Sequence, residues 1–211
     1  MGIIKQGILG GFRGKVGSVV GGAWKGIATM RAMPLTVANP RTPSQVNNRD
    51  RNTAILALAQ AVSISFIRTY WNRFAKSMSG FNMFMSVNKN VYNPATLVYD
   101  WASVIVSNGT ITPPVVSAVT QTEHGYVDVE FSYPLTDNTR LSSDVVGIVV
   151  VNGIQLTGHA VDNVPNSAGV WTVDVPVGTE IGDILYVYVV SRRADGTLTS
   201  YTTSAQVFNV V

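Results

Sequence analysis

The sequence predicts a mixed α+β protein in which a Gly-rich β-hairpin and a helical region precede an antiparallel β-sandwich. Three observations predict this order. Glycine occupies nine of the first 26 positions, helical periodicity starts at residue 43, and apolar and polar residues alternate over 115–211. A chain of 211 residues is long enough for two domains of about 100 residues each. We therefore expect one domain over 1–112 and another over 113–211, divided at Pro113-Pro114.

The Gly-rich segment predicts a hairpin over 14–33. Its apolar residues form two candidate strands, 16–20 and 23–33, on either side of Gly21-Gly22, and a glycine pair between two strands is a hairpin signal. An isolated two-stranded hairpin is only marginally stable in water. This hairpin therefore needs cover from the rest of its domain or from another subunit.

A strong helix-start signal follows the hairpin. Thr42 is a candidate N-cap, Pro43 occupies the first helical position, and the Thr-x-x-Gln spacing completes a capping box. The pattern predicts a helix over 43–76 with two apolar stripes, which implies burial on two sides. Ser63 and Ser65 are weak helix formers that can bend or break this helix.

Two shorter elements complete the expected first domain. A helix is predicted over 81–91, with aromatic residues on one face. Pro94 stops this helix, because proline cannot continue one. A strand is predicted over 97–106, before the turn signal at Asn108-Gly109.

The second domain shows the period-two pattern of strands that are buried on one face. Asn152-Gly153 and Asp195-Gly196 are expected as tight hairpin turns. Seven short strands in about 100 residues predict an antiparallel sandwich of the immunoglobulin or fibronectin type III kind. The expected strands are 115–122, 126–133, 145–151, 154–159, 170–175, 184–192 and 198–210.

The net charge of +3 conceals a strong division along the chain. Residues 113–211 hold ten acids but three basic residues, whereas the acids of residues 1–112 are Asp50 and Asp100 alone. The basic residues of 1–112 are Lys5, Arg13, Lys15, Lys25, Arg31, Arg41, Arg49, Arg51, Arg68, Arg73, Lys76 and Lys89. A basic half of this kind can bind nucleic acid, or it can bind the acidic half of a neighbouring copy.

Charged residues make up 13% of the chain, about half the usual share. Two interpretations fit this low fraction. Either much of the surface is buried against other chains, or the protein is β-rich with an uncharged Thr, Ser and Asn surface.

The residues that could support chemistry are few, so we expect no enzymatic activity, no cofactor and no metal site. The chain has no cysteine, which excludes thiolate catalysis and cysteine-ligated zinc. Its two histidines, His124 and His159, lack the convergent partners that a zinc site or a catalytic triad requires. A phosphate loop is also excluded, because Gly14-Lys15 is followed by Val16 in place of Ser or Thr.

Basic residues with interleaved aromatic residues form the one constellation of note. Such a set can contact phosphates and stack bases, but no nucleic-acid motif accompanies it, and we favour contacts with protein. The candidate assembly-interface residues are Trp24, Lys25, Arg31, Arg49, Arg51, Arg68 and Arg73. Trp24 is the best single anchor, because tryptophan is enriched among interface hot spots.

Several segments together resemble a known group of sequences. They are 1–17 (MGIIKQGILGGFRGKVG), 24–27 (WKGI), 39–42 (NPRT) with Gln45 and Arg49, and 79–82 (SGFN) with 99–109. The chain resembles an uncharacterised family of Bacteroidota and their tailed phages and prophages, which pairs such an N-terminal region with a C-terminal β-sandwich. The resemblance covers nearly the whole chain and implies no activity. Its occurrence in phage structural contexts implies a virion component.

The leading hypothesis is a non-enzymatic structural protein of a Bacteroidota phage particle, located at the capsid, neck or tail and acting by repetitive self-association. The expected partners are further copies of the chain and other virion proteins, with no small-molecule substrate and no membrane span, since no apolar run reaches about 18 residues. One alternative is a bacterial surface or extracellular adhesion module whose sandwich binds a ligand. A weaker alternative is a nucleic-acid-binding protein that uses the basic half.

Overall fold

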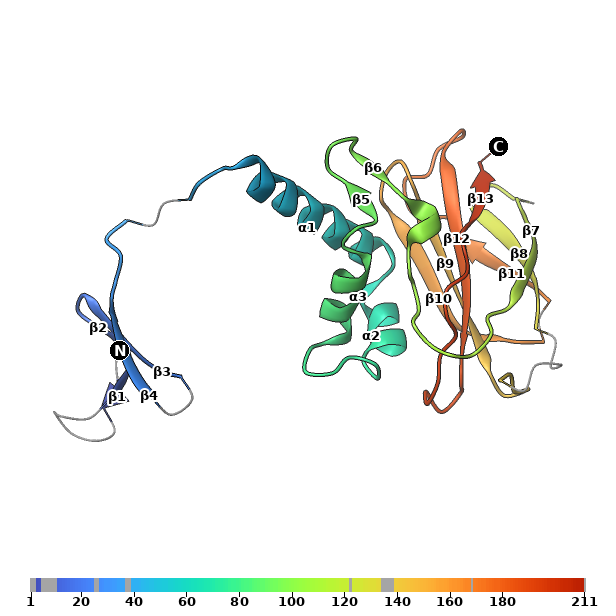
Figure 1. Ribbon diagram of the computed structural model, residues 1–211. Coiled ribbons are helices and arrows are strands. Elements are labelled where there is room, and N and C mark those ends of the chain that lie inside the picture. Colours follow the sequence, from blue (N-terminus) through green and yellow to red (C-terminus); the bar gives the residue numbers. More distant parts are fainter. Residues whose placement is uncertain are drawn as a thin grey trace. The chain divides into compact units, whose positions relative to one another are not determined.

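The chain forms two compact units, Met1–Thr42 and Pro43–Val211 (Figure 1). The computed structural model describes residues 3–4, 11–24, 27–36, 39–121, 123–133, 139–167 and 169–210. The division at 42/43 differs from the boundary expected at 112/113. The boundary lies earlier because the helices that follow Thr42 share a core with the strands that follow Pro114.

The N-terminal unit is a four-stranded antiparallel sheet in the order β1-β2-β3-β4. Its strands are β1 (Ile3–Ile4), β2 (Phe12–Val16), β3 (Val19–Trp24) and β4 (Ile27–Ala32). The expected turn at Gly21-Gly22 is wrong, because both glycines lie inside β3, opposite Met30 and Thr29. The chain turns instead at Gly17-Ser18, where Gly17 has a φ of 55° that disfavours other residues.

The helical region begins at Pro43, as predicted, but its first helix is broken. The three helices are α1 (Pro43–Ala61), α2 (Ile64–Trp71) and α3 (Gly80–Asn88). The expected helix over 43–76 is interrupted at Ser63, whose φ of 76° lies outside the helical region, and α1 and α2 meet at 91°. The end of α1 touches β10 so closely that a Cβ on Gly158 would lie 2.1 Å from the Ala61 carbonyl oxygen. After the bend, α2 lies against the same strand, where Tyr70 of α2 donates to Asp162 of β10 at 3.0 Å.

The expected strand over 97–106 is wrong. In its place, the short strands β5 (Tyr92–Asn93) and β6 (Val98–Tyr99) pair with each other, and a 3-10 turn, η1 (Trp101–Ser103), follows. The next residues bond to side chains and not to a neighbouring strand: the Asn88 side chain receives the Ile105 N–H and donates to its carbonyl, and the Thr202 hydroxyl accepts the Val106 N–H. A strand ladder is therefore not needed to satisfy this backbone.

The remaining strands form two antiparallel sheets. One has the order β10-β9-β12-β13 and the other has the order β11-β8-β7. Their bounds are β7 (Val115–Thr120), β8 (Tyr126–Ser132), β9 (Val145–Asn152), β10 (Gly158–Pro165), β11 (Val170–Asp174), β12 (Ile184–Arg192) and β13 (Gln206–Asn209). Five agree closely with the prediction, whereas β10 starts later than the expected 154–159 and β13 is shorter than the expected 198–210. The turn after β9 is wider than a two-residue hairpin, since the Asn152 N–H reaches the Thr157 carbonyl.

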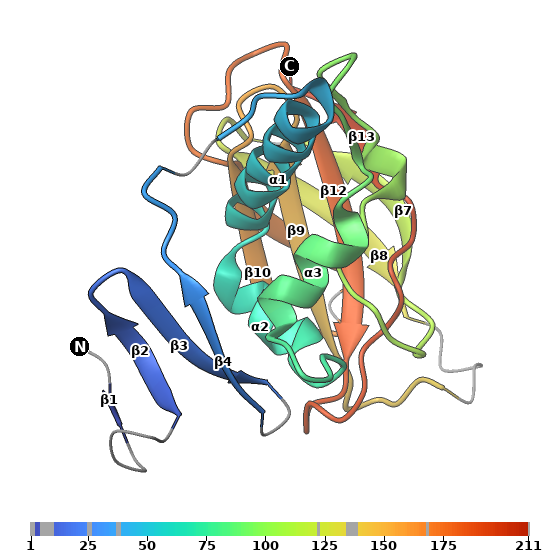
Figure 2. The same cartoon turned by 60° about the vertical axis from the view of Figure 1, so that its left-hand side comes forward.

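Two hydrophobic clusters hold the C-terminal unit together. One joins the two sheets and contains Val129 of β8, Ile148 of β9 and Val187 of β12. The other joins α1–α3 to the opposite side of β9 and β12. Strand β9 is therefore buried on both faces over Val146–Asn152. The unit thus has three layers, with the helices over one sheet and the other sheet beyond it (Figures 1 and 2), and the protein is a mixed α and β structure composed mostly of strands.

Candidate interaction sites

The pairing register divides the N-terminal sheet into two unlike faces. Gly14 pairs with Gly21, which pairs with Met30, so one face combines these residues with their period-two neighbours. That face is apolar or small at every position; it carries Phe12, Gly14, Val16, Val19, Gly21, Ala23, Ala28, Met30 and Ala32. We call it the apolar face.

The other face carries positive charge. Lys15 pairs with Val20, which pairs with Arg31, so these two bases lie on the same face. Gly14 has a φ of 100°, which interrupts the alternation of side chains along β2, so Arg13 does not count with them. We call this the basic face, defined by Lys15 and Arg31. The N-terminal unit has no Asp or Glu in its sequence, so these charges have no acidic partner within it.

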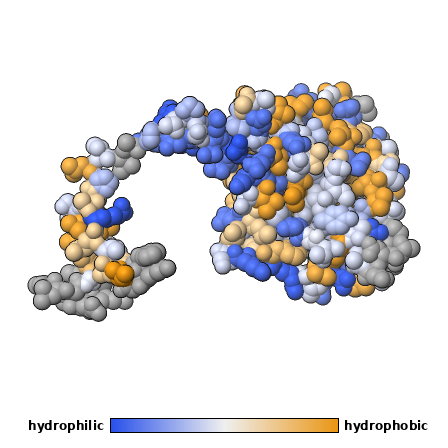
Figure 3. Space-filling view, in the orientation of Figure 1, coloured by the Kyte–Doolittle hydropathy of each residue, from blue (hydrophilic) through white to orange (hydrophobic). Residues whose placement is uncertain are grey.

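Both faces are accessible to water. Met30 is 72% exposed, Ile27 is 64% exposed and Val16 is 49% exposed. Among the described residues of this unit, Gly21 alone is buried, because Phe12 packs against its Cα so closely that a Cβ there would collide with the ring. Figure 3 shows hydrophobic residues at the surface of both units. Over its described residues, the sheet therefore has no buried core of its own.

The seven residues predicted for an assembly interface are divided between the two units. Arg31 lies on the basic face of β4; Trp24 ends β3, and its side chain, like Lys25 as a whole, lies outside the described residues. Arg49, Arg51 and Arg68 belong to α1 and α2, and Arg73 follows α2 and donates to the Gly196 carbonyl oxygen at 3.4 Å.

Sequence reasoning omitted Lys15, which shares the face of Arg31. This common face depends on the turn at Gly17-Ser18, whereas the sequence predicts the turn at Gly21-Gly22. Because the turn was misplaced, the sequence did not bring the two residues together.

The outer face of the β11-β8-β7 sheet carries charge of the opposite sign. Val127, Val129 and Phe131 of β8 point into the core, so Asp128 and Glu130 point to the other side of the sheet. Asp174 of β11 shares this side, because its neighbour Val173 is buried in the same core, and its side chain is 62% exposed. No lysine or arginine occurs in these three strands. We call this surface the acidic sheet face.

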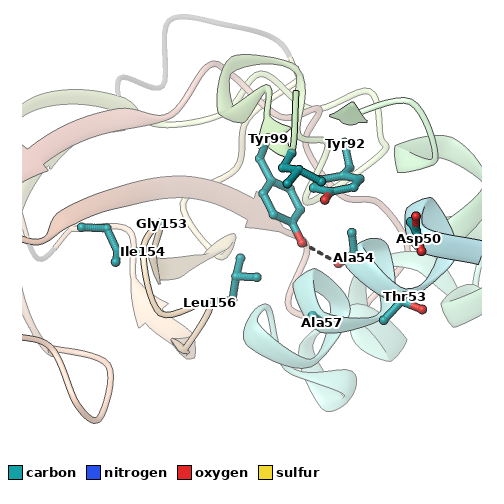
Figure 4. A pocket seen from close by; sticks show the side chains of 10 residues that line it. Asp50, Thr53, Ala54, Ala57, Tyr92, Tyr99, Gly153, Ile154 and Leu156 are labelled. Atoms are coloured by element: carbon teal, nitrogen blue, oxygen red, sulfur yellow. Dashed lines mark hydrogen bonds between the residues drawn. The ribbon is translucent and has the colours of Figure 1, made fainter. Parts of the chain in front are cut away.

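A groove of about 530 Å³ lies between α1, the β5–β6 hairpin and the loop after β9 (Figure 4). Tyr92 and Tyr99 form one wall, with ring centroids 4.9 Å apart, and the Tyr99 hydroxyl donates to the Ala54 carbonyl oxygen at 2.9 Å. Burial raises the pKa of Tyr99 to about 12, so its hydroxyl keeps this proton. Leu97 and Ile154, at 70% and 62% exposed, form part of the rim.

The loop that forms the far wall of the groove is organised by two buried polar side chains. The Asn152 side-chain oxygen accepts the backbone N–H groups of Ile154 and Gln155 at 2.9 and 3.0 Å. Its amide donates to Asp183 at 2.7 Å, and Asp183 also accepts the Glu180 backbone N–H at 3.0 Å. These hydrogen bonds, that from Glu180 first, hold the pKa of Asp183 below its usual value. These hydrogen bonds therefore fix the loop after β9 that forms the far wall of the groove.

A polar cluster between α2 and the sheet has a structural role. Arg192 donates to both carboxylate oxygens of Asp162, with the shortest hydrogen bond at 2.9 Å, and Asp162 accepts the Tyr70 hydroxyl at 3.0 Å. Burial, and then the nearby Asp162 charge, raise the pKa of Tyr70 well above its usual value. Each charged group has its partners, so the cluster fixes α2 on the sheet.

The two histidines do not form a chemical site. His159 lies 3.9 Å from Asp174 in an exposed pair, and His124 lies in the turn between β7 and β8. Within the part of the chain that the structure describes, no three His, Asp or Glu residues gather where a metal ion could bind. Over the same residues, no single helix is long and apolar enough to cross a membrane, although α1 and α2 would qualify as a bent pair by length and composition.

Comparison with known proteins gives a family and a structural likeness. The search of curated proteins gives no match. Among solved structures, the chain is similar to the fn3 domain of human collagen alpha-1(XX) chain, at 15% sequence identity and a TM-score of 0.37, over 50% of this chain and 90% of that one. A family model described as a family of unknown function, DUF6266, matches residues 11–204. Because this match spans most of the N-terminal sheet and nearly all of the C-terminal unit, the chain belongs to the DUF6266 family.

Proposed function

We propose that the protein is a non-enzymatic structural component that acts by repetitive self-association, with the N-terminal sheet as its docking element. One observation carries the proposal. A four-stranded sheet with one continuous apolar face has a single buried residue, Gly21, among those described. Sheets of this kind need another layer against the apolar face to be stable.

The energy available from covering this face is substantial. Fully burying a side chain such as Val or Met is worth about 1.5–3 kcal/mol, and the face exposes several such side chains, Met30 and Val16 among them. Exposed apolar patches rimmed by polar residues mark interaction surfaces. In a repetitive assembly, a neighbouring chain would cover the apolar face of every subunit.

The C-terminal unit supports a finer proposal about its fold, a sandwich of the fibronectin type III kind with helices added on one face. Its strands β7 to β13 divide into the sheets β11-β8-β7 and β10-β9-β12-β13. The fourth strand of the seven, β10, joins the sheet of the third strand, β9. In a constant-type immunoglobulin domain the fourth strand joins the other sheet, so the strand order favours the fibronectin type.

The setting proposed for this assembly is a phage virion, and it rests on the sequence resemblance to a family of Bacteroidota and their tailed phages. The chain has few charged residues, and its N-terminal sheet needs a neighbour to cover the apolar face. Both properties fit a protein that assembles in many copies. The expected partners are copies of the chain and other virion proteins.

Light scattering of the purified full chain tests self-association. We expect a mass of several chains at micromolar concentration and near-physiological salt, with amide hydrogen exchange over 12–32 slowing as the protein concentration rises. Slow exchange reports backbone that is covered and hydrogen-bonded. A single-chain mass, with rapid exchange over 12–32 at every concentration, would contradict the proposal.

The groove favours a second candidate function, an adhesion module of a bacterial surface. Its volume lies in the range of ligand sites, and Leu97 and Ile154 offer apolar contacts at its rim. Binding of the full chain to Bacteroidota cells, abolished by Ile154→Arg and unaffected by Val207→Arg on exposed β13, would support this function. Equal binding by the two variants would exclude the groove.

A further inference from the structure

We propose that the basic face of the N-terminal sheet binds the acidic sheet face of a second copy of the chain; this inference rests on the proposed function and adds a second contact to the one that covers the apolar face. The basic face is defined by Lys15 and Arg31, and the acidic sheet face by Asp128, Glu130 and Asp174. Two properties of these surfaces carry the inference, their charge and the exposed apolar groups beside the charges.

The charges are complementary and are concentrated in different units. The N-terminal unit contains no acid, whereas the strands β7, β8 and β11 contain no lysine or arginine. Like faces would repel one another, and unlike faces would attract, so charge favours contact between a basic face and an acidic sheet face. The neighbourhood of the acidic sheet face adds one titratable base, His159, which lies 3.9 Å from Asp174.

Both surfaces also present apolar groups that contact would cover. Tyr126 and Val170 lie on the acidic sheet face at 42% and 50% exposed; they alternate with residues of the core on β8 and β11. Ile27 and Thr29 lie on the basic face of β4, two and four residues before Arg31. The contact would thus combine charge pairing with apolar burial.

Contact between two unlike faces is heterologous and has a geometric consequence. Every chain keeps one basic face and one acidic sheet face to offer, so the contact can repeat head to tail into a ring or a filament. Two chains that each bind the acidic sheet face of the other would close as a dimer.

Two full-chain double variants test the inference. The basic-face variant carries Lys15→Gln and Arg31→Gln; the acidic-face variant carries Glu130→Gln and Asp174→Asn. We expect each to raise the concentration for half-assembly by about fivefold at low salt, as two weak ion pairs together would, with a smaller effect at high salt. Circular dichroism that matches the unsubstituted chain verifies folding.

Mixing the two variants gives the decisive measurement. The basic-face variant keeps an intact acidic sheet face, and the acidic-face variant keeps an intact basic face. In the mixture these two intact faces can bind each other, so one contact forms between each pair of unlike chains. The mean mass of the mixture should therefore rise above that of either variant alone. Matched controls with equal charge change elsewhere should assemble like the unsubstituted chain. These are Lys76→Gln with Lys89→Gln for the bases, and Glu180→Gln with Asp195→Asn for the acids.

Three outcomes would overturn the inference while leaving self-association intact. They are normal assembly of either face variant, failure of the mixture to regain mass, or loss of assembly in the controls to the same extent. A fourth outcome is binding of duplex DNA by the basic face, with an affinity that falls steeply with salt and with unaltered assembly of the acidic-face variant. A monomeric unsubstituted chain would instead contradict the proposed function itself.

Discussion

The two units of this protein differ in how they are stabilised. The C-terminal unit, Pro43–Val211, buries both faces of β9, one against α1–α3 and the other against the second sheet. The N-terminal unit, Met1–Thr42, has a complete hydrogen-bonded sheet but a single buried residue among those described. The difference shows that strand pairing by itself forms a sheet but does not give it a core, and that the missing layer must come from elsewhere.

The charges of the two units follow the same division. The C-terminal unit uses several of its acids internally: Asp162 pairs with Arg192 at 2.9 Å, and the buried Asp144 lies 3.2 Å from Arg193 and accepts the Tyr133 hydroxyl. The bases of the N-terminal unit have no acid within it. Charge thus fixes the structure in one unit and remains available for partners in the other.

The largest expected effect tests whether Pro43–Val211 is one cooperative unit. Trp71 is fully buried, packs edge-on against Phe84 and donates to the Val106 carbonyl oxygen at 2.7 Å. Trp71→Ala should lower the free energy of unfolding by about 3–5 kcal/mol in chemical denaturation followed by circular dichroism. Met30→Ala, on the exposed apolar face, should change it by less than about 0.5 kcal/mol. Separate transitions for the helices and the sheets would refute the single unit.

A smaller effect is expected from adding one methyl group to each unit. A Cβ on Gly147 of β9 would lie 2.3 Å from the Tyr70 hydroxyl and 2.9 Å from the Phe66 ring. Gly147→Ala should therefore cost about 1–3 kcal/mol of unfolding free energy through overpacking. Gly22→Ala, where the nearest atom is 3.5 Å away, is the matched control and should be close to neutral. Equal costs would mean that the N-terminal sheet is packed as tightly as the C-terminal unit.

The hydroxyl of Tyr99 tests the packing of α1 against the β5–β6 hairpin. Tyr99→Phe removes its hydrogen bond to Ala54 and should cost about 0.5–1.5 kcal/mol. Because burial raises the pKa of Tyr99 to about 12 from 10.0, the stability it adds is complete below pH 10.0 and is lost as the pH rises toward 12. Ultraviolet titration should show one fewer late-ionising tyrosine in the variant. An unchanged late phase would contradict this account.

The smallest effect concerns acid stability at the groove loop. Hydrogen bonds from Glu180 and Asn152 hold the pKa of Asp183 below 3.8. Its contribution to stability is therefore present above pH 3.8 and is lost as the pH falls from there through the lowered value. Asp183→Asn should make unfolding less dependent on pH in that range, as thermal melts at successive pH values would show. An identical acid dependence in both proteins would refute a lowered pKa.

The elements with strong local signals were predicted well from the sequence. The helix start at Pro43 has a clear capping pattern, and the alternation of β8, β9 and β12 identifies strands because one face of each is consistently apolar. The turns were predicted less well. Several glycines compete for each turn of the N-terminal sheet, and local sequence cannot show that Gly21 is needed inside a strand to admit the Phe12 ring.

The candidate surfaces were predicted in part. The sequence showed that positive charge is concentrated near the N-terminus and negative charge near the C-terminus, and it identified Arg31 as a site residue. It did not place Lys15 beside Arg31, because cross-strand neighbours depend on register. Nor did it identify the groove, whose walls come from α1, the β5–β6 hairpin and the loop after β9.

The sequence alone determined the kinds of elements, their order and the separation of charge, because each of these depends on residues close together in the chain. The tertiary structure decided where the units divide. The helices of 43–88 have two apolar stripes, and only the tertiary structure shows that β9 and β12 cover one of them. A domain boundary depends on contacts between segments that are distant in the sequence. Here the core that the helices share with β9 and β12 determines it, and the prolines at 113 and 114 do not.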